Sequence, residues 1–311
     1  MSNSIEIVSV NISTEKGTIK RPVDEVIVGD TGIADDAHAG PWHRQVSMLA
    51  QESIERFGAQ ADRSFAPGDF AENLTTRGLD LSQVAILDRF QIGDVALEIT
   101  QIGKECHGDG CAIFQEVGRC VMPKEGIFCR VLHGGTIRPG DALHHIPRPL
   151  KIRVITMSDR AARGEYQDKS GPRIKELLDE FFAGKRWHVE IESTILPDDA
   201  DKLRAELTAA RDGGADVAIT TGGTGAGPRD VTPETASAVC DKIIPGIMEN
   251  IRIKYGSQKP NALLSRGIAG IASQTQIYTL PGSSRAVAEY MTEILKTLEH
   301  IIFMIHGVDV H

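Results

Sequence analysis

Residues 216–234 read DVAITTGGTGAGPRDVTPE, an apolar run followed by a glycine-rich loop and a segment typical of a helix start. Gly222 and Gly227 have the spacing of the Walker phosphate loop, but Pro228 stands where that motif needs a lysine. Gly223 and Gly225 do not fit the dinucleotide fingerprint either, because the glycines here are evenly two apart. The stretch therefore predicts a strand, an anion-binding loop of neither kind, and a helix.

Strand and helix patterns alternate in the same way on both sides of this stretch. Strands are expected at residues 152–157, 189–195, 216–220 and 276–280, and helices at residues 172–182, 200–211, 233–241, 246–255 and 285–306. This alternation predicts an α/β domain with a mostly parallel sheet and helices on both faces. Thr232 is expected to cap the helix in which Pro233 takes the first position.

The part of the chain before residue 147 reads mostly as strands and turns. Its apolar runs include IEIVSVNI, VALEITQIG and GIFCRVLHGGTIRPGDAL, the last with a Gly-Gly and a Pro-Gly-Asp turn signal, and one helix is expected at residues 48–57. These features predict a β-rich barrel or sandwich. Pro147 and Pro149 indicate a stiff connector, so we expect domains at residues 1–148 and 149–311.

Composition and charge narrow the class of protein. The 311 residues are 41% apolar and 25% charged, with a net charge of −9, and neither half has the basic excess expected of a nucleic-acid binder. No apolar run reaches the length of a membrane span, and the first residues lack the features of a signal peptide. We therefore expect a cytoplasmic protein that binds neither nucleic acid nor membrane.

Two aspartates belong to the loops at the expected carboxyl edge of the sheet, where open parallel sheets bind ligands. Asp198 follows one strand, and Asp230 ends the glycine loop. A carboxylate repels a phosphate unless a cation lies between them, so phosphate loops with two carboxylates predict Mg²⁺ and phosphoryl or nucleotidyl transfer. The alternatives are structural: a plain glycine turn, Asp198 as the cap of the next helix, and Ser283 and Ser284 as caps.

Six motifs in order resemble the molybdopterin-binding domain of molybdopterin adenylyltransferases. They are SDRAARGEYQDKSGP, LPDD, TTGGTGAGPRDVTPE, PGIMENIR, NALLSRGIAGI and LPGSSRAV, and they cover residues 151–311. The resemblance implies a three-layer α/β sandwich, a homotrimer, and ATP-dependent adenylylation of the terminal phosphate of molybdopterin. It also implies Mg²⁺, ATP and molybdopterin as the small molecules bound.

The resemblance also assigns roles to residues at matching positions. Asp198 and Asp230 match the two functional aspartates thought to act through Mg²⁺. The positions that match cofactor-binding loops are Ser158 and Asp159 near the nucleotide, Thr221, Gly222, Gly223, Thr224 and Gly225 on the pterin phosphate, and Ser265, Pro281, Gly282 and Ser283 on further ligand loops.

Four of the five cysteines lie between Cys106 and Cys129. Cys106 stands in a glycine-flanked loop beside Lys104 and His107, and neighbouring positive charge favours a reactive thiolate. The alternatives are an inert loop thiol or a zinc site, although the later cysteines lack paired zinc spacing. Cys129 lies in an apolar strand and is expected to be buried.

A second resemblance covers residues 4–146. The stretches ADDAHAGPWHRQVS, GDFAENLTTRGLDL, GKECH and CVMPKEGIFCRVLHGGTIRPGD resemble the MOSC domain, the C-terminal domain of molybdenum-cofactor sulfurases. The resemblance implies a β-rich fold and one cysteine that carries persulfide sulfur or ligates the molybdenum of the cofactor. Cys106 matches this cysteine by motif, and Cys120 is the alternative. The other motif positions, which are expected to line the same pocket, are His38, His43, Arg44, Glu72, Asn73 and Thr75. For His38 and His43 the alternative is a structural role.

Together these features predict a two-domain protein of molybdenum-cofactor biosynthesis. The C-terminal domain is expected to adenylylate molybdopterin, and the N-terminal domain to bind the molybdenum cofactor or to carry sulfur. The expected partners are a molybdate-insertion protein or a molybdoenzyme. The rival interpretation is a non-catalytic carrier or scaffold that binds the cofactor without turnover.

Overall fold

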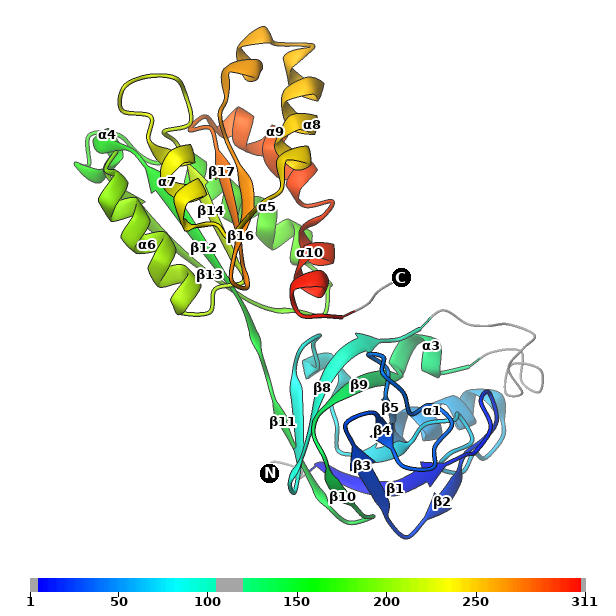
Figure 1. The fold of residues 1–311 in the computed structure, drawn as a ribbon. Helices are drawn as coiled ribbons and strands as arrows, with labels where there is room; N and C mark the ends of the chain where they lie inside the picture. Colours follow the sequence, from blue (N-terminus) through cyan, green and yellow to red (C-terminus); the bar gives the residue numbers. More distant parts are fainter. Residues whose placement is uncertain (1–4, 105–119, 309–311) are drawn as a thin grey trace. The chain divides into compact units, whose positions relative to one another are not determined.

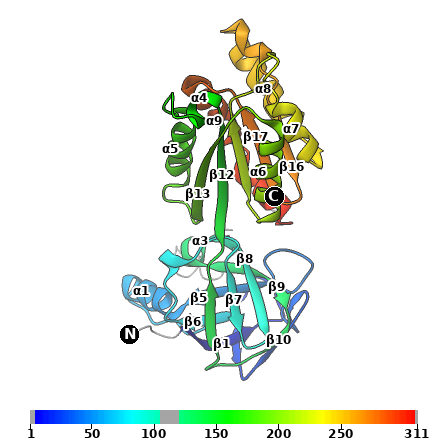
Figure 2. The ribbon, with the colours of Figure 1, turned by 90° about the vertical axis from the view of Figure 1, so that its left-hand side faces the viewer.

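The computed structural model describes residues 5–104 and 120–308. The chain divides into two compact units, Met1–Arg148 and Pro149–His311, and each is described here by itself. Both units are drawn in Figures 1 and 2.

The N-terminal unit is built on a closed barrel (Figure 1). Around the barrel the strands follow the order β11-β7-β8-β9-β5-β6-β1, and the pairing of β1 with β11 closes it, while β2 adds to β1. The strands are β1 Ile5–Ile12, β2 Arg21–Val23, β5 Val46–Ala50, β6 Leu74–Arg77, β7 Arg89–Ile92, β8 Val95–Ile102, β9 Ile127–His133 and β11 Ala142–Ile146. The predicted β-rich barrel is confirmed.

Further elements surround the barrel. A small sheet joins β3 Val26–Gly29 with β4 Gly32–Ile33 and β10 Gly135–Ile137, and the helices are α1 Gln51–Ala61, η1 Leu81–Gln83 and α3 Met122–Glu125. The barrel interior is apolar, with Ile7, Met48 and Leu97 fully buried in one cluster. A register shift between Ile7 and Ser9 marks a bulge, which bends a strand as closure requires.

The helix expected at residues 48–57 is present, but its bounds are shifted to Gln51–Ala61. Met48 and its neighbours instead form β5, which pairs with both β6 and β9. Burial on both sides gives that strand a continuous apolar run, which periodicity cannot distinguish from a helix start. At the Gly-Gly turn signal the chain passes from β9 to β10, and β10 pairs with β3.

The C-terminal unit contains a mixed sheet (Figure 2). Its strands follow the order β13-β12-β14-β17-β16-β15. The strands are β12 Pro149–Met157, β13 His188–Leu196, β14 Val217–Thr221, β15 Lys242–Ile243, β16 Ala269–Ala272 and β17 Thr275–Leu280. The first four in the order pair in parallel, whereas β16 and β15 are antiparallel. The prediction of a mostly parallel sheet with helices is confirmed, and the antiparallel edge is an addition.

Helices contact both faces of this sheet. They are α4 Asp159–Ala162, α5 Ser170–Phe182, α6 Ala200–Asp212, α7 Thr232–Val239, α8 Pro245–Gly256, η3 Pro260–Leu264, α9 Ser284–Ile294 and α10 Leu298–Ile305. Ile155 and Ile277 point toward α6 and α7 in one buried cluster. On the strands they alternate with residues that face α5 and α9, which pack against each other and against β12 and β17.

The long helix expected at residues 285–306 is interrupted. Helix α9 ends at Ile294, and α10 begins at Leu298. The intervening residues contain neither glycine nor proline, so the sequence carries no ordinary break signal here.

Candidate functional site

The loops that leave the parallel strands gather at one edge of the C-terminal sheet. The glycine loop follows β14 and the Pro281 loop follows β17, and Gly222 N donates to the carbonyl oxygen of Leu280 at 2.9 Å. A Cβ added to Gly282 would lie 3.4 Å from Gly222 Cα, so the two backbones are in close contact. The glycine loop and the Pro281 loop, on neighbouring strands, are thereby brought together as expected from parallel topology.

The glycines allow this close approach. Gly222 has φ +102° and Gly223 has φ +65°. A Cβ on Gly222 would lie within 3.0 Å of the Met157 carbonyl oxygen, and one on Gly223 within 3.0 Å of the Thr232 hydroxyl. Side chains at these two positions are excluded by both backbone conformation and space.

A cavity of about 450 Å³ opens between these loops and the segment before β16. Its lining includes the predicted residues Gly222, Gly223, Thr224, Gly225, Asp230, Ser265, Pro281, Gly282 and Ser283. Thr221 is absent from this lining: it is fully buried, and its hydroxyl donates to the Pro281 carbonyl oxygen at 2.9 Å. Thr221 therefore ties the two loops together.

The charged side chains on the far side of this cavity belong to none of the positions selected from the sequence. Glu289 Oε1 lies 3.4 Å from Lys259 Nζ and 3.1 Å from Arg285 Nε. All three line the cavity together with Tyr290. They come from the η3 segment and from α9, whose relative placement no spacing rule reveals.

A second cavity, of about 300 Å³, lies on the other side of the glycine loop. Its lining residues are Met157, Ser158, Asp198, Gly223, Gly227, Pro228, Arg229 and Asp230. This cavity brings together the two aspartates predicted for Mg²⁺, although they lie on different loops. Gly223 and Asp230 line both cavities, so the two spaces meet at these residues.

Asp230 is held by its own loop. Its Oδ2 accepts from Gly227 N at 2.8 Å, and a Cβ on Gly225 or Gly227 would meet this carboxylate within 3.0 Å. The loop glycines thus leave room for the carboxylate to fold back against the backbone. The same folding keeps it on the boundary between the two cavities.

Asp198 is not the cap of the following helix, which was the structural alternative. Asp199 has that role: its Oδ1 accepts from Asp201 N at 2.9 Å and Lys202 N at 3.1 Å. Asp198 instead exchanges contacts with Asp159, whose N lies 3.4 Å from Asp198 Oδ2 while Asp198 N donates to Asp159 Oδ1 at 3.1 Å.

The donor set suits a hard divalent cation. Carboxylate oxygens of Asp198 and Asp230 line one cavity, and Asp159 lies beside Asp198. Mg²⁺ prefers one or two carboxylates, with further oxygens from phosphate and water. These residues therefore fit Mg²⁺ together with a phosphate ligand.

Several hydroxyl groups have capping roles. Ser158 Oγ accepts from Ala161 N at 3.2 Å and Ser283 Oγ accepts from Ala286 N at 3.2 Å, so each begins a helix. The predicted cap Thr232 is wrong, because Val231 is the N-cap of α7 and Thr232 is its first residue. The buried Thr232 hydroxyl has no hydrogen-bond partner among the described residues and lies against Gly223.

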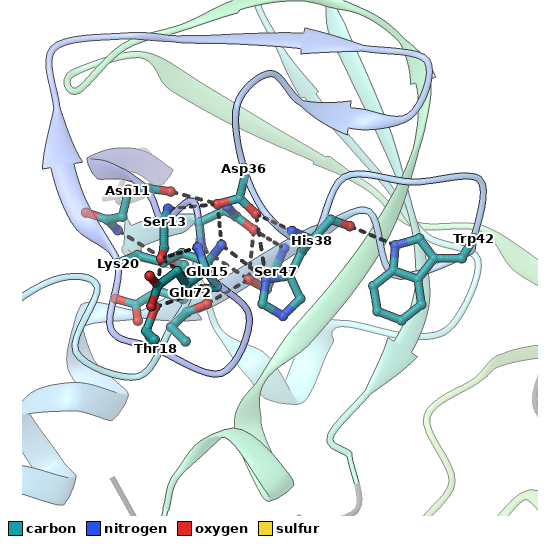
Figure 3. Close-up of polar contacts among 12 residues, drawn as sticks. Asn11, Ser13, Glu15, Thr18, Lys20, Asp36, His38, Trp42, Ser47 and Glu72 are labelled. Carbon is teal, nitrogen blue, oxygen red and sulfur yellow. Dashed lines mark hydrogen bonds and ion pairs between the residues drawn. The ribbon is translucent and has the colours of Figure 1, made fainter. Parts of the chain in front are cut away.

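In the N-terminal unit a polar cluster surrounds Lys20, as Figure 3 shows. The Lys20 ammonium group is fully buried, forms an ion pair with Asp36, and lies 3.4 Å from His38 Nδ1. Burial lowers the pKa of Lys20. Burial would raise the pKa of Asp36, but hydrogen bonds from His38 and Lys20 outweigh it and hold this pKa well below its usual range.

Glu72 completes this cluster from the loop before β6. Its Oε1 accepts from Gly68 N at 2.7 Å and from the Thr75 hydroxyl at 2.8 Å. Burial raises the pKa of Glu72, and the hydrogen bonds from Gly68 N and the Thr75 hydroxyl offset this rise only in part. Lys20 and Asp36 were not selected from the sequence, although Asp36 belongs to the quoted ADDAHAG stretch.

The remaining predicted residues of this unit have different surroundings. His38 is partly exposed, and its backbone oxygen accepts from Trp42 Nε1 at 2.8 Å. The Arg44 guanidinium lies 4.8 Å from the Trp42 ring centroid. Asn73 Oδ1 accepts from Ser47 N at 3.1 Å and therefore holds β5 to the loop before β6. His43 is half-buried, and its carbonyl oxygen accepts from the Thr100 hydroxyl at 2.6 Å.

The cysteines separate by environment. Cys106 lies outside the described residues. Cys120 is half-buried and packs against an apolar cluster that contains Phe57 and Phe70. Cys129 is fully buried in β9, as predicted, and burial raises its pKa far above the usual thiol range.

Comparisons with known proteins divide at the same place as the fold. Residues 35–144 match the MOSC domain family, and residues 153–300 match a family described as a probable molybdopterin binding domain. The molybdopterin adenylyltransferase of Helicobacter pylori strain J99 is 35% identical over 159 residues, which are 51% of this chain and 89% of that protein. The molybdopterin adenylyltransferase of Escherichia coli K12 is 32% identical over 160 residues, or 51% of this chain and 80% of that protein.

A solved structure has a similar match. The molybdopterin biosynthesis enzyme MoaB from Thermus thermophilus is 34% identical, with 51% of this chain and 97% of that chain covered and a TM-score of 0.46. Separately, none of the helices among the described residues is both long and apolar enough to cross a membrane.

Proposed function

The chain belongs to the family of molybdopterin adenylyltransferases through its C-terminal domain, and from that membership we propose that this domain transfers the adenylyl group of ATP to molybdopterin. The observation that carries the proposal is the pair of cavities that meet at Gly223 and Asp230. We assign the larger cavity to the pterin with its phosphate and the smaller one to the nucleotide. The shared boundary is then the place where phosphate and nucleotide meet.

The reaction follows from this placement. An oxygen of the pterin phosphate attacks the α-phosphorus of ATP, a new P–O–P linkage forms, and the bond to the β-phosphate breaks with release of pyrophosphate. The nucleophile is already an anion, so no strong general base is required. What the site must supply is alignment of two anions and neutralisation of their charge.

The chain's own residues provide both. The glycine loop presents backbone N–H groups without side chains in the way, and the first turn of α9 adds its positive end at Ser283. On the far side of the larger cavity, Lys259 and Arg285 add positive charge to the lining of the space assigned to the pterin. Bound Mg²⁺, held by Asp198 and Asp230, would reduce the repulsion between the two phosphate groups.

The family resemblance extends the proposal to fold detail and partners. We propose the three-layer α/β sandwich and the homotrimer that the resemblance implies. The product would pass to a molybdate-insertion protein or to a molybdoenzyme. For a protein with these reactants we propose a cytoplasmic location.

The test measures pyrophosphate and binding separately. Wild-type protein with molybdopterin, Mg²⁺ and ATP is expected to release pyrophosphate. Asp230→Asn should lower kcat by about 10²–10³-fold, as expected when a group that stabilises transition-state charge is lost, while molybdopterin affinity changes little. Asp212→Asn is the matched control, because Asp212 is an exposed aspartate paired with Arg211 and outside both cavities.

Two outcomes would contradict the proposal. Absence of pyrophosphate from a folded wild-type protein that still binds molybdopterin would favour the carrier interpretation. Equal losses of binding and turnover in Asp230→Asn would argue against the role assigned to Asp230.

For the N-terminal MOSC domain we propose binding of the molybdenum cofactor or transport of sulfur through Cys106. The support is the sequence resemblance, together with the buried Lys20 cluster beside the motif histidine His38. After incubation with a persulfide donor, mass spectrometry of the peptides is expected to find one added sulfur atom on Cys106. Loading that persists in Cys106→Ser but disappears in Cys120→Ser would transfer the assignment to Cys120.

A further inference from the structure

Arg229 lies in the site but has no role in the reaction as proposed above. It precedes Asp230 in the glycine loop and lines the smaller cavity. Its Nη1 lies 2.9 Å from Asp159 Oδ2, with the Arg229 side chain 77% exposed and that of Asp159 26% exposed. Arg229 is the one cationic side chain among the described residues that line this cavity.

The partner of Arg229 belongs to the carboxylate group of the site. Asp159 Oδ1 accepts from Asp198 N at 3.1 Å, and Asp159 N lies 3.4 Å from Asp198 Oδ2. Arg229 therefore contacts the other carboxylate oxygen of Asp159, the one that Asp198 N does not use. Asp159, Asp198 and Asp230 therefore gather at this place, and the Arg229 guanidinium contacts this group of carboxylates through Asp159.

The ion pair between Arg229 and Asp159 can readily be replaced by a contact with another anion. An ion pair with an exposed partner contributes little to stability, because water and salt screen it. A guanidinium forms stronger, paired hydrogen bonds with phosphate oxygens. The exposed Arg229 side chain can turn toward a ligand by itself, while contacts of Asp230 with Gly227 N and with Arg266 hold the backbone of the loop.

We propose that Arg229 changes its ion-pair partner when the nucleotide binds. In the free protein it pairs with Asp159, and in the complex it pairs with the outer phosphates of the nucleotide. This inference rests on the assignment of the smaller cavity to the nucleotide. In the transfer step the bond between the α-phosphorus and the bridging oxygen breaks, and its electron pair remains on pyrophosphate. Arg229 neutralises that charge as it forms, and its departure from Asp159 frees a carboxylate oxygen at the place where the donor set fits a divalent cation.

The exchange predicts opposite changes in two affinities. Without Arg229 the phosphates of ATP lose a cation, so Arg229→Ala should weaken binding of ATP in EDTA by about 10-fold or more, the usual scale for a charge-assisted hydrogen bond. The same variant removes the cation that competes at Asp159. Binding of Mn²⁺ alone, followed by electron paramagnetic resonance, should therefore tighten by up to about fivefold.

Turnover gives a third measurement. In Arg229→Ala the kcat for pyrophosphate release should fall by about 10-fold or more, while the KM for molybdopterin stays within about twofold. Arg229→Lys should recover part of the ATP affinity, since a lysine keeps the charge without the paired geometry. Arg173→Ala is the matched control, because Arg173 forms an exposed ion pair with Glu176 on α5 outside both cavities.

The results separate this inference from the proposed function. Unchanged ATP and Mn²⁺ affinities in a folded Arg229→Ala protein would overturn it and leave an ordinary surface ion pair. Weaker binding of both ATP and Mn²⁺ would overturn it as well, because exchange requires the two to move in opposite directions. If the wild type makes no pyrophosphate but both affinities shift as stated, the exchange stands and adenylyl transfer is what fails.

Discussion

Replacing Gly222 with alanine tests whether the glycine loop needs its glycines for close backbone approach. Gly222 has φ +102°, and a Cβ there would lie within 3.0 Å of the Met157 carbonyl oxygen. Gly184, in the turn after α5, has φ +75° with nothing within 4 Å of an added Cβ. Gly184→Ala in the same domain therefore measures the cost of the backbone conformation without the collision.

The expected difference follows from these two geometries. The positive φ costs an alanine about 1–2 kcal/mol at Gly184, and at least as much at Gly222, whose φ lies farther from the left-handed helical value. At Gly222 the collision with a backbone oxygen adds about 1–3 kcal/mol, the range for overpacking in a rigid surrounding. Neither the strand β12 nor the loop can yield freely, because Gly222 N is bonded to Leu280 and Met157 ends a central strand. Gly222→Ala should therefore lose more stability than Gly184→Ala by about the overpacking amount.

Differential scanning calorimetry of both full-length variants measures this difference. For a domain of this size 1 kcal/mol corresponds to about 2–4 °C in Tm, so Gly222→Ala should unfold several degrees below the control. Gly222→Ala should also lose pyrophosphate formation, because the displaced loop lines both cavities. Gly184→Ala should still form pyrophosphate. Equal shifts in Tm, or normal turnover in Gly222→Ala, would refute the claim that the loop depends on this contact.

Three further predictions concern groups outside the glycine loop. Lys20→Met leaves the Asp36 carboxylate buried without its cation and should destabilise the N-terminal domain by about 3–5 kcal/mol; an unchanged urea midpoint would contradict this, and adding Asp36→Asn should restore part of the loss. Burial raises the folded-state pKa of Glu72, so its contribution to stability is present below the unfolded value of about 4.3 and is lost as pH rises through the folded pKa. Glu72→Gln, which imitates the neutral acid, should flatten the decline of the urea midpoint above that pH, and parallel declines in both proteins would argue against it. Burial also raises the pKa of Cys240 to about 11 and that of Cys129 further, so iodoacetamide at pH 8 should alkylate Cys240 slowly and spare Cys129 in the native protein; rapid modification of Cys129 without unfolding would be inconsistent with its burial.

The C-terminal strands and helices could be predicted closely because short strand patterns and amphipathic helix patterns alternate there between polar loops. The strand expected at residues 189–195 is His188–Leu196, and the helix expected at residues 200–211 is Ala200–Asp212. The errors arose where local pattern does not determine the outcome. Met48 lies in a strand because both of its neighbours in the barrel are strands, which is a tertiary effect.

Only the part of the candidate site that lies on loops at strand ends could be predicted from the sequence. Parallel topology brings Asp198 and Asp230 to one cavity even though they follow different strands and lie far apart in the sequence. Glu289 with its two cations and the Lys20–Asp36 pair could not be found in this way. Each depends on how a helix or an irregular loop is placed in three dimensions, and no spacing rule records that placement.

Asp198 and Asp199, which follow β13, show that helix capping and a role in the site can belong to two neighbouring residues. Asp199 has φ −130° and ψ 117°, and its N donates to the Pro197 carbonyl oxygen at 2.7 Å, so the chain turns tightly at Asp198. Asp199 can therefore turn toward the N–H groups that begin α6, while Asp198 turns to the cavity that contains Asp230. Asp199 already accepts hydrogen bonds from the first N–H groups of α6, so Asp198 is not needed as a cap. Its carboxylate remains available to interact with Asp159, with a cation or with a ligand that contains phosphate.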